Sequence, residues 1–179
     1  MNTEKLSKTM AYALRHKPAE FELTLNAQGW VSLSALVKAM NNAMKFPVNQ
    51  ELVMEVVNAD TKQRYTVKNG MIRAAQGHSF PIELGIAQSV PPEFLFHGTT
   101  TKTLPLIFAE GLKSMSRAHV HLSSNITVAT SVGARHGTPV VLKVSALLAH
   151  KAGVQFFQAE NGVWLSTPVP AEFVSVNNY

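Results

Sequence analysis

Apolar residues recur with helical spacing in three segments of the first sixty residues. The first repeat predicts a helix over residues 3–16 that ends before Pro18. The other two predict helices that begin after Ser32 or Ser34 and after Asn49, because such side chains accept hydrogen bonds from the first N–H groups of a helix. The apolar positions of the three helices are Leu6, Met10, Leu14, Leu33, Leu36, Val37, Met40, Leu52, Val53, Val56 and Val57.

A β-hairpin is predicted directly after the third helix. Residues 64–67 and 71–73 flank Asn69-Gly70, a dipeptide that favours the tight turn between two antiparallel strands. Trp30-Val31 predicts a further short strand. Three short helices followed by a hairpin are typical of a winged-helix-like fold, which often binds nucleic acid, although a fold does not fix a function.

The second half of the chain has a different pattern, in which short β-runs outnumber helices. Helices are predicted near residues 101–110 and 125–136, the second capped by Asn125. A lobe with few helices and several strands is typical of the α+β class. The predicted β-runs are residues 94–97, 119–123, 139–144, 154–157, 163–166 and 173–176.

Residues 82–93 predict a connection between two lobes, because they lack clean periodicity and contain Pro91-Pro92. We therefore expect an α+β protein with two lobes. The N-terminal lobe, residues 1–90, is expected to be winged-helix-like, and residues 91–179 are expected to form a mixed α/β lobe.

Composition limits the location and chemistry of the protein. There is no cysteine and no apolar stretch at the N-terminus or elsewhere long enough to cross a membrane, so we expect a cytoplasmic protein without disulfides or a membrane span. The net charge of +5 favours anionic partners such as nucleic acid, but a mildly basic protein with no such partner would show it too. Asp60 is the only aspartate, so the carboxylate clusters that bind Mg²⁺ or Ca²⁺ are missing and no metal is expected.

Polar residues alternate with apolar ones between positions 117 and 123. In a β-strand, Arg117, His119, His121 and Ser123 would share one face, which would suit a polar, anionic ligand. Zinc binding by the two histidines and a solvated edge strand are the alternatives. No third zinc ligand with suitable spacing is evident.

Phe96-His97-Gly98-Thr99 ends a predicted strand and enters a turn. Gly98 would allow another backbone or a ligand to approach closely, and His97 and Thr99 offer a donor and an acceptor there. An ordinary strand end, with Thr99 or Thr100 capping the next helix, is the alternative.

Two predicted helix ends carry basic residues. Arg15 and His16 lie in the last turn of the first helix, and His136 lies in the last turn of the helix that Gly137 is expected to end. The helix dipole alone would favour these positions, so a ligand is not required to explain them. No P-loop and no dinucleotide-binding glycine motif occurs in the chain.

Taken together, the motifs resemble the RNA 2′-phosphotransferase family, also called tRNA 2′-phosphotransferases. They run in the family's order over nearly the whole chain, and the ordered set is more specific than any single motif. The matching segments are Leu14-Arg15-His16-Lys17-Pro18, Gln28-Gly29-Trp30-Val31, Lys62-Gln63-Arg64-Tyr65, residues 72–79, Phe96-His97-Gly98-Thr99, Gly111-Leu112, residues 115–123, residues 132–137 and Asn161-Gly162-Val163-Trp164-Leu165.

The resemblance implies a winged-helix-like RNA-binding lobe and a C-terminal NAD-binding lobe of the ADP-ribosyltransferase type. It implies that an internal RNA 2′-phosphate attacks the nicotinamide ribose of NAD and displaces nicotinamide. The resulting RNA-2′-phospho-ADP-ribose then yields 2′-hydroxyl RNA and ADP-ribose 1″,2″-cyclic phosphate, a reaction of tRNA splicing. NAD would be consumed as a co-substrate without any metal, and the enzyme is expected to act as a monomer on tRNA-like RNA.

The resemblance also assigns residues to roles. The family's catalytic residues correspond to Arg15, His16, Arg64 and Arg117. Two other functions stay open from the sequence: a one-step ADP-ribosyltransferase acting on nucleic-acid phosphate ends, and a non-catalytic RNA- or nucleotide-binding module. The positions that correspond to the NAD site are His97, Gly98, Thr99, His119, Ser123, His136 and Val163.

Overall fold

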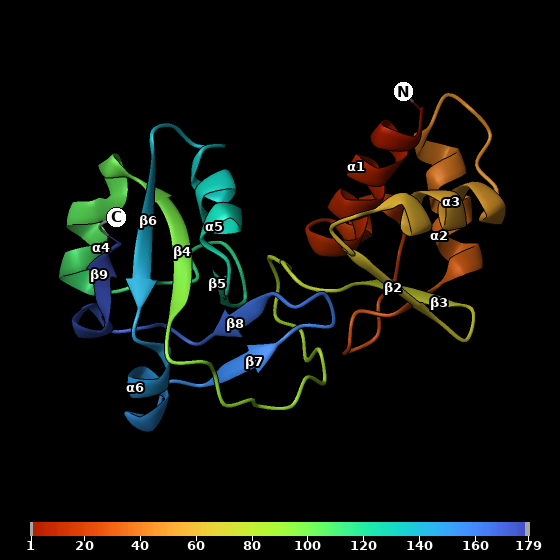
Figure 1. Ribbon diagram of the computed structural model, residues 1–179. Helices are drawn as coiled ribbons and strands as arrows, with labels where there is room; N and C mark the ends of the chain where they lie inside the picture. The colour runs from red at the N-terminus through yellow and green to blue at the C-terminus, as the bar shows by residue number, and fades with distance from the viewer. Residues whose placement is uncertain (1, 178–179) are drawn as a thin grey trace. The chain divides into compact units, whose positions relative to one another are not determined.

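The computed structural model describes residues 2–177, and the chain divides into two compact units, Met1–Gly85 and Ile86–Tyr179 (Figure 1). Both units combine helices with small antiparallel sheets, which is consistent with the α+β class that the sequence predicts. Within the described range, no helix combines the length and the apolar character needed to cross a membrane.

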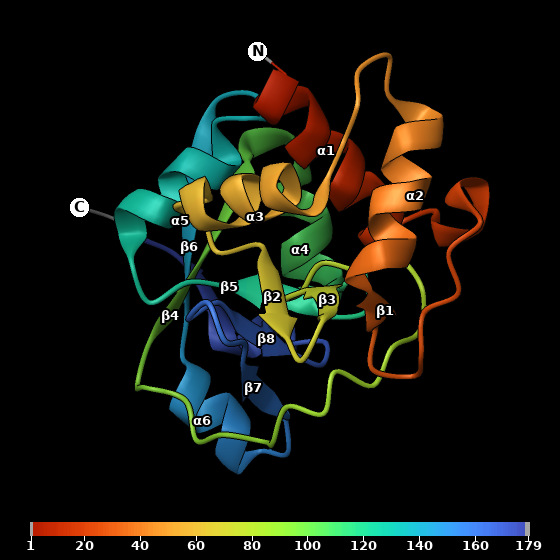
Figure 2. The same ribbon diagram turned by 90° about the vertical axis from the view of Figure 1, so that its right-hand side faces the viewer.

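The first unit contains three α-helices and an antiparallel sheet with strand order β1-β3-β2. Figures 1 and 2 show the three helices gathered on one side of this small sheet. Its elements are α1 (Asn2–Arg15), the 3₁₀ helix η1 (Pro18–Phe21), β1 (Val31–Ser32), α2 (Leu33–Ala43), α3 (Gln50–Ala59), β2 (Tyr65–Lys68) and β3 (Met71–Ala74).

Side-chain caps fix the starts of α2 and α3. Ser32 Oγ accepts a hydrogen bond from Ala35 N at 3.1 Å, and Asn49 Oδ1 accepts one from Leu52 N at 2.9 Å. Each bond satisfies an N–H group that has no partner inside its own helix, which typically stabilises a helix by about 1 kcal/mol. The sequence predicted the cap of α3 and offered Ser32 or Ser34 for α2, and the structure selects Ser32.

The core of the first unit is built on the apolar stripe of α1. Leu6, Met10 and Leu14 have 0% exposure, as the four-residue repeat predicts. The stripe packs against the buried side chains of α2 and α3, among them Leu36 and Val53. Burial of this stripe holds the C-terminal end of α1 in a defined position.

The predicted hairpin is confirmed. Asn69 and Gly70 have φ angles of 51° and 72°, the left-handed values that a tight two-residue turn of this kind requires. The register pairs Tyr65 at the start of β2 with Ala74 at the end of β3. This pairing places Arg64 immediately before the sheet, close in sequence to the end of α3.

The second unit contains two antiparallel sheets with strand orders β4-β6-β9 and β5-β8-β7. The sheets are joined where Phe96 N donates to Ser123 O at 2.7 Å and Ser123 N donates to Phe96 O at 2.8 Å. Its elements are β4 (Leu95–Thr100), η2 (Thr101–Thr103), α4 (Leu104–Glu110), β5 (Val120–Leu122), α5 (Ile126–Gly133), β6 (Pro139–Val144), α6 (Ala146–Lys151), β7 (Phe156–Gln158), β8 (Trp164–Ser166), η3 (Ala171–Phe173) and β9 (Val174–Val176).

Each β-run predicted in this half forms a strand, from β4 to β9. Asn125 caps α5, as predicted, by accepting a hydrogen bond from Val128 N at 3.2 Å. Two predictions are wrong: α5 ends at Gly133 with Ala134 as its C-cap, so Gly137 does not end the helix, and α6 was not expected.

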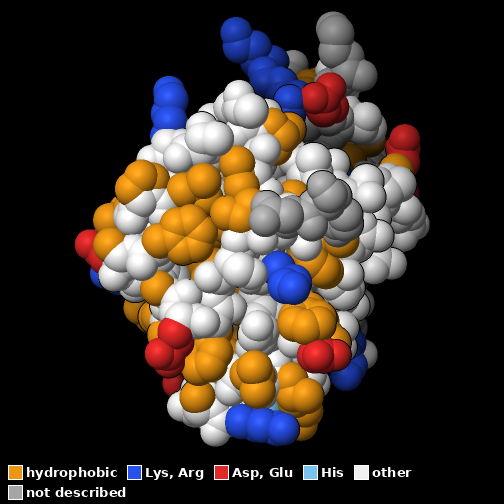
Figure 3. Space-filling view, turned by 60° about the vertical axis from the view of Figure 1, so that its left-hand side comes forward, with side chains coloured by type: hydrophobic (Ala, Val, Ile, Leu, Met, Phe, Trp, Pro, Cys, Tyr) orange, Lys and Arg blue, Asp and Glu red, His pale blue; other side chains and the backbone are white. Residues whose placement is uncertain are grey.

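Exposed hydrophobic side chains are a second feature of this unit. Figure 3 shows hydrophobic side chains gathered on one face, with few charged groups among them. The large exposed hydrophobic residues of the unit include Leu106 and Phe108 on α4, Leu148 on α6 and Val176 on β9. The residues predicted to bind a ligand lie on other elements, so α4, α6 and β9 do not contribute to the candidate site described below.

Candidate functional site

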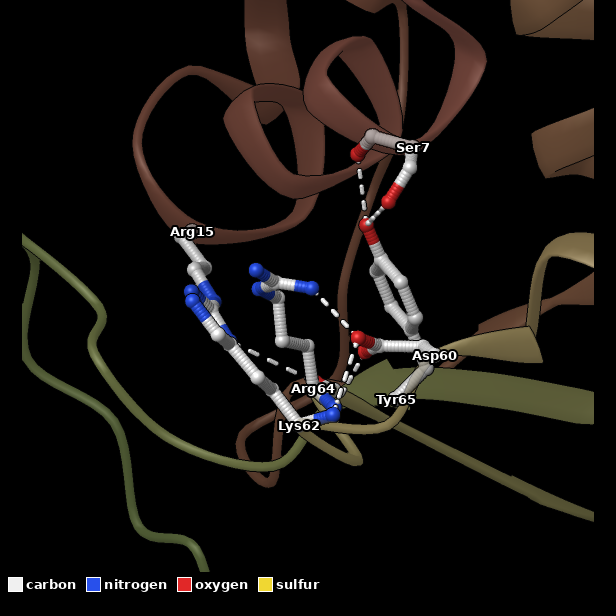
Figure 4. A network of polar contacts seen from close by, with 6 residues as sticks. All are labelled: Ser7, Arg15, Asp60, Lys62, Arg64 and Tyr65. Atoms are coloured by element: carbon white, nitrogen blue, oxygen red, sulfur yellow. Dashed lines mark hydrogen bonds and ion pairs between the residues drawn. The ribbon is translucent and has the colours of Figure 1, made fainter. Parts of the chain in front are cut away.

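Arg15 and Arg64 meet within the first unit. Arg15 is the last residue of α1, and Arg64 directly precedes β2. Arg15 Nη2 donates to the carbonyl oxygen of Arg64 at 3.5 Å, across 49 positions of sequence (Figure 4). The same carbonyl accepts a second bond from Ala75 N at 2.8 Å, so it is fixed by the hairpin. Two of the arginines predicted to be catalytic therefore belong to one cationic site.

Asp60 binds both the backbone and the guanidinium of Arg64. Its carboxylate accepts hydrogen bonds from Arg64 N at 2.7 Å and from Lys62 N at 3.2 Å, and it forms an ion pair with the Arg64 guanidinium (Figure 4). The Asp60 side chain is 3% exposed, whereas the Arg64 side chain is 33% exposed. The Arg64 guanidinium is thus anchored at one end while part of the side chain stays accessible to a ligand.

Tyr65 connects this site to the middle of α1. Its hydroxyl donates to the carbonyl oxygen of Ser7 at 2.6 Å. Burial raises the pKa of the Tyr65 phenol, which keeps the group neutral and able to donate. The bond fixes the start of β2 against α1, and so supports the approach of Arg64 to Arg15.

His16 follows α1 directly and has an exposed side chain. Its backbone N–H donates to Tyr12 O at 3.0 Å, which continues the hydrogen bonding of the last helical turn. Arg15 and His16 therefore stand together at the C-terminal end of α1, where the helix dipole favours positive charge. The His16 ring lies 6.1 Å, centre to centre, from the ring of Tyr12 on the preceding helical turn.

Three histidines are linked by backbone carbonyls in the second unit. His97 Nδ1 donates to His121 O at 3.0 Å, and His121 Nδ1 donates to His119 O at 3.0 Å. Because a carbonyl only accepts, His97 carries its hydrogen on Nδ1, and Nε2 is the acceptor of the neutral ring. Burial lowers the pKa of His97 and of His119 below their usual values, so both rings are held neutral near pH 7.

The strand predicted around Arg117 is shorter than expected. β5 covers only Val120–Leu122, and Arg117 lies in a bend before it, so residues 117–123 do not form one continuous strand face. The alternation holds inside the strand, where Val120 and Leu122 are buried and His121 faces the other way. The cause is pairing: β5 has three partners in β8, and the preceding residues have none in the sheet.

Arg117 nevertheless acts electrostatically on His97. Its positive charge contributes to the lowered pKa of His97, after the larger effect of burial. Burial also lowers the pKa of Arg117 itself, and the neighbouring charge of Arg135 lowers it further. The region around His97 and Arg117 is therefore positively charged and suited to an anion.

Gly98 serves the packing of α5 on β4. A Cβ atom at this position would lie 1.7 Å from Ala129 O and 2.9 Å from Gly133 N. Gly133 makes the reciprocal approach, since its Cβ would lie 2.6 Å from Thr99 O. Of the two roles that the sequence left open for Gly98, the structure shows the approach of another backbone.

The hydroxyl groups near His97 already have partners. Thr99 Oγ1 lies 2.6 Å from Thr103 Oγ1, and neither Thr99 nor Thr100 forms a side-chain cap at the next helix. Ser123 Oγ donates to Asn125 O and accepts from Asn125 N, both at 3.0 Å. Ser123 thereby shapes the turn into α5.

His136 and Val163 lie outside the hydrogen bonds that link the three histidines. His136 is exposed, three residues beyond the end of α5, so its predicted place in the last helical turn is wrong. Val163 is partly buried and immediately precedes β8, after the predicted turn at Gly162, whose φ is 77°. Among residues 2–177, no group of three or more His, Asp or Glu side chains is arranged to hold a metal ion.

Comparison with known proteins decides the family. Residues 1–168 match the model of the RNA 2′-phosphotransferase, Tpt1 / KptA family. The chain belongs to this family. A probable RNA 2′-phosphotransferase of Rhizobium johnstonii is 43% identical over 174 residues, which cover 97% of this chain and 94% of the relative. Similar proteins of the same description occur in Pectobacterium carotovorum (42% identity, 94% and 92% covered) and Streptomyces coelicolor (43% identity, 96% and 94% covered).

Membership of the RNA 2′-phosphotransferase family confirms the resemblance seen in the sequence. The match runs through both units, so the first-unit arginines and the second-unit histidines all fall within the family region. Two residues of this family member escaped the sequence reasoning. Asp60 could have been noticed from its position four residues before Arg64, just after a predicted helix. Gly133 lies in the segment 132–137 that resembles the family, but its close approach to Thr99 was not predicted.

Proposed function

We propose that the protein removes an internal 2′-phosphate from RNA in an NAD-dependent reaction. In the first step, a phosphate oxygen bonds to the anomeric carbon of the nicotinamide ribose while the bond from that carbon to nicotinamide breaks. In the second step, the ribose 2″-hydroxyl attacks phosphorus, and the RNA 2′-oxygen leaves with a proton. The products are nicotinamide, RNA with a free 2′-hydroxyl, and ADP-ribose 1″,2″-cyclic phosphate.

The observation that carries this proposal is the meeting of Arg15 and Arg64 in a chain of this family. An RNA 2′-phosphate has nearly two negative charges, so it needs cationic donors more than it needs a base. Guanidinium groups bind phosphate oxygens through paired hydrogen bonds, and each charge-assisted bond contributes about 1.5–3 kcal/mol. His16, beside Arg15, is assigned to phosphate contact first and to proton transfer second.

Arg117 is assigned to the second step. Charge then accumulates on the oxygens around phosphorus, where a fixed guanidinium stabilises the transition state more than the ground state. The positive region that Arg117 and Arg135 create is suited to this task and to the phosphates of a dinucleotide.

The groups around His97 fit a dinucleotide substrate. The neutral His97 ring offers Nε2 as an acceptor for a ribose hydroxyl, and the nearby guanidinium charge favours a pyrophosphate. Gly98 contributes by letting α5 pack closely behind this strand. The residues proposed to hold NAD are His97, Gly98, Thr99, His119, Ser123, His136 and Val163.

Val163 bears on which acceptor can react. The resemblance places it where many protein-modifying ADP-ribosyltransferases have a glutamate. A valine cannot activate a weak acceptor as a carboxylate would, so the acceptor must be a strong nucleophile by itself. A 2′-phosphate meets that condition.

We also propose roles for the two parts of the chain. The three helices and hairpin of the first unit would form the winged-helix-like RNA lobe, within residues 1–90. The second unit would form the ADP-ribosyltransferase-like NAD lobe, within residues 91–179. Three of the proposed catalytic residues belong to the first and Arg117 belongs to the second, so catalysis would require the whole chain.

The direct test mixes the protein with NAD⁺ and an oligonucleotide that bears one internal 2′-phosphate, without added metal and with a chelator present. We expect mass spectrometry to find 2′-hydroxyl RNA, nicotinamide and ADP-ribose 1″,2″-cyclic phosphate in equal amounts. ADP-ribose left on the RNA by the unaltered protein would instead indicate a one-step transferase. RNA binding without nicotinamide release would indicate a binding module.

A further inference from the structure

The only aspartate in the sequence, Asp60, binds one of the proposed catalytic arginines, Arg64. Asp60 lies at the C-terminal end of α3, and its side chain is 3% exposed. Its carboxylate contacts groups two and four residues further along: it accepts hydrogen bonds from Lys62 N and Arg64 N and forms an ion pair with the Arg64 guanidinium. A buried carboxylate with such local partners fixes the shape of the loop and the direction of Arg64 together.

The loop around Asp60 is tightly closed. Gln63 N donates to Asp60 O at 2.8 Å, and Gln63 adopts a φ of 45°, which non-glycine residues seldom have. The backbone N–H groups of Lys62 and Arg64 then turn toward the Asp60 carboxylate, as Figure 4 shows. The Arg64 backbone is therefore set before any ligand arrives.

We propose that Asp60 is a positioning residue that holds the Arg64 guanidinium in the orientation needed for transfer of the RNA 2′-phosphate. This inference rests on the proposed function, in which Arg64 contacts the phosphate. The contact with Asp60 uses one edge of the guanidinium, and Arg15 lies beside the Arg64 carbonyl. The remaining N–H groups of Arg64 would face the phosphate from a single, fixed direction.

The physical reason is preorganisation. A long arginine side chain that is free to sample several rotamers must lose that freedom when it binds the transition state, whereas an anchored one has already lost it. Asp60 also offsets the charge of Arg64, so it adds nothing to the general attraction of RNA. Its effect should therefore appear in turnover rather than in binding.

The test compares Asp60→Asn with Glu4→Gln in the full-length protein. Asp60→Asn removes the charge but keeps the shape and one acceptor oxygen for the loop. Glu4 and Lys8 form an ion pair with the same four-residue spacing at 2.7 Å, but both side chains are more than two-thirds exposed. We expect kcat on a 2′-phosphorylated oligonucleotide to fall on the order of 10²-fold for Asp60→Asn with a KM change below about threefold, and to be unchanged for Glu4→Gln.

A double-mutant cycle separates positioning from a general effect on the fold. In an Arg64→Gln background, Asp60→Asn should cause no further loss of single-turnover rate, because the group that it positions is gone. A second loss of similar size in that background, or an unchanged kcat for the single variant, would overturn the proposal. If Asp60→Asn unfolds, Asp60→Glu takes its place, because it keeps the charge but moves the guanidinium. An unchanged kcat for Asp60→Glu would also overturn the proposal.

Failure of the proposed function would look different. The unaltered protein would then release no nicotinamide with the 2′-phosphorylated oligonucleotide, and the variants would have no rate to lose. Fluorescence anisotropy gives a readout without turnover. Asp60→Asn should bind the 2′-phosphorylated oligonucleotide at least as tightly as the unaltered protein, and weaker binding would count against a positioning role.

Discussion

Replacing Gly98 with alanine tests how closely α5 approaches β4. The backbone of Gly98 is in an extended strand that any residue can adopt, so alanine brings no conformational strain of its own. The added methyl group would lie 1.7 Å from Ala129 O, 2.7 Å from Ala129 C and 2.9 Å from Gly133 N. All three atoms belong to the backbone of α5, so the overlap cannot be relieved by turning a side chain.

The helix must therefore move away from the strand, or the strand must bend. Overpacking of a well-packed interior costs typically 1–3 kcal/mol, and a backbone obstacle places Gly98→Ala at the upper end, about 3 kcal/mol. For a chain of this length, each kcal/mol lowers Tm by about 2–4 °C, so we expect a decrease of roughly 6–12 °C. Loss of the close contact would also move the His97 strand relative to α5.

Gly162→Ala is the matched control. Gly162 has a φ of 77°, and a Cβ atom there would meet nothing within 4 Å. Its alanine variant suffers only the backbone cost of the left-handed conformation, about 1–2 kcal/mol, and should lower Tm by about 2–8 °C. Thermal unfolding followed by circular dichroism measures both variants. A Tm for Gly98→Ala that equals that of the unaltered protein would refute the close packing described above.

Three further predictions concern other parts of the chain. Burial lowers the pKa of His97 below its usual value of about 6.5. The stabilising contribution of the neutral ring is therefore present above about pH 6.5 and lost as the pH falls through the folded-state pKa. His97→Gln should flatten the pH dependence of the free energy of unfolding, measured by urea titration, in this range. Arg73→Met should lower the free energy of unfolding by about 2 kcal/mol in urea titrations. The reason is that the buried guanidinium donates to Leu84 O at 2.9 Å and lies 4.6 Å from the Trp30 ring centre. An unchanged urea midpoint of unfolding would show that these two contacts do not contribute to stability. Arg117→Ala should accumulate RNA that carries ADP-ribose, detected as a mass increase, and recovery of unmodified substrate alone would instead assign Arg117 to the first step.

The sequence predicted those parts of the fold that depend on neighbouring residues. The stripe of Leu6, Met10 and Leu14 needs only helical periodicity, and the turn at Asn69-Gly70 needs only the backbone freedom of those two residues. The strands of the second unit were found in the same way, from short apolar runs between turn residues. The helix α6 was missed because six residues are fewer than two turns, too few for a repeat to appear.

Two further features that escaped prediction depend on partners far away in the chain. The alternation from Arg117 to Ser123 is consistent with a long strand, but the length of β5 is set by how many residues of β8 pair with it. The pairing of Gly98 with Gly133 likewise exists only once α5 lies on β4. Periodicity describes one segment at a time, so it predicts neither the length of β5 nor the close contact between Gly98 and Gly133.

The candidate site shows why residue type alone describes an anion-binding group poorly. In the sequence, Arg15 and Arg64 are two equivalent sources of positive charge. In the folded unit, the buried Asp60 carboxylate offsets the charge of Arg64 and holds its guanidinium. Under the proposed function, Arg64 would then contribute direction more than general attraction of the RNA phosphate. Charge removal at Arg64 should therefore act chiefly on kcat, and it should change RNA binding and the salt dependence of that binding only weakly.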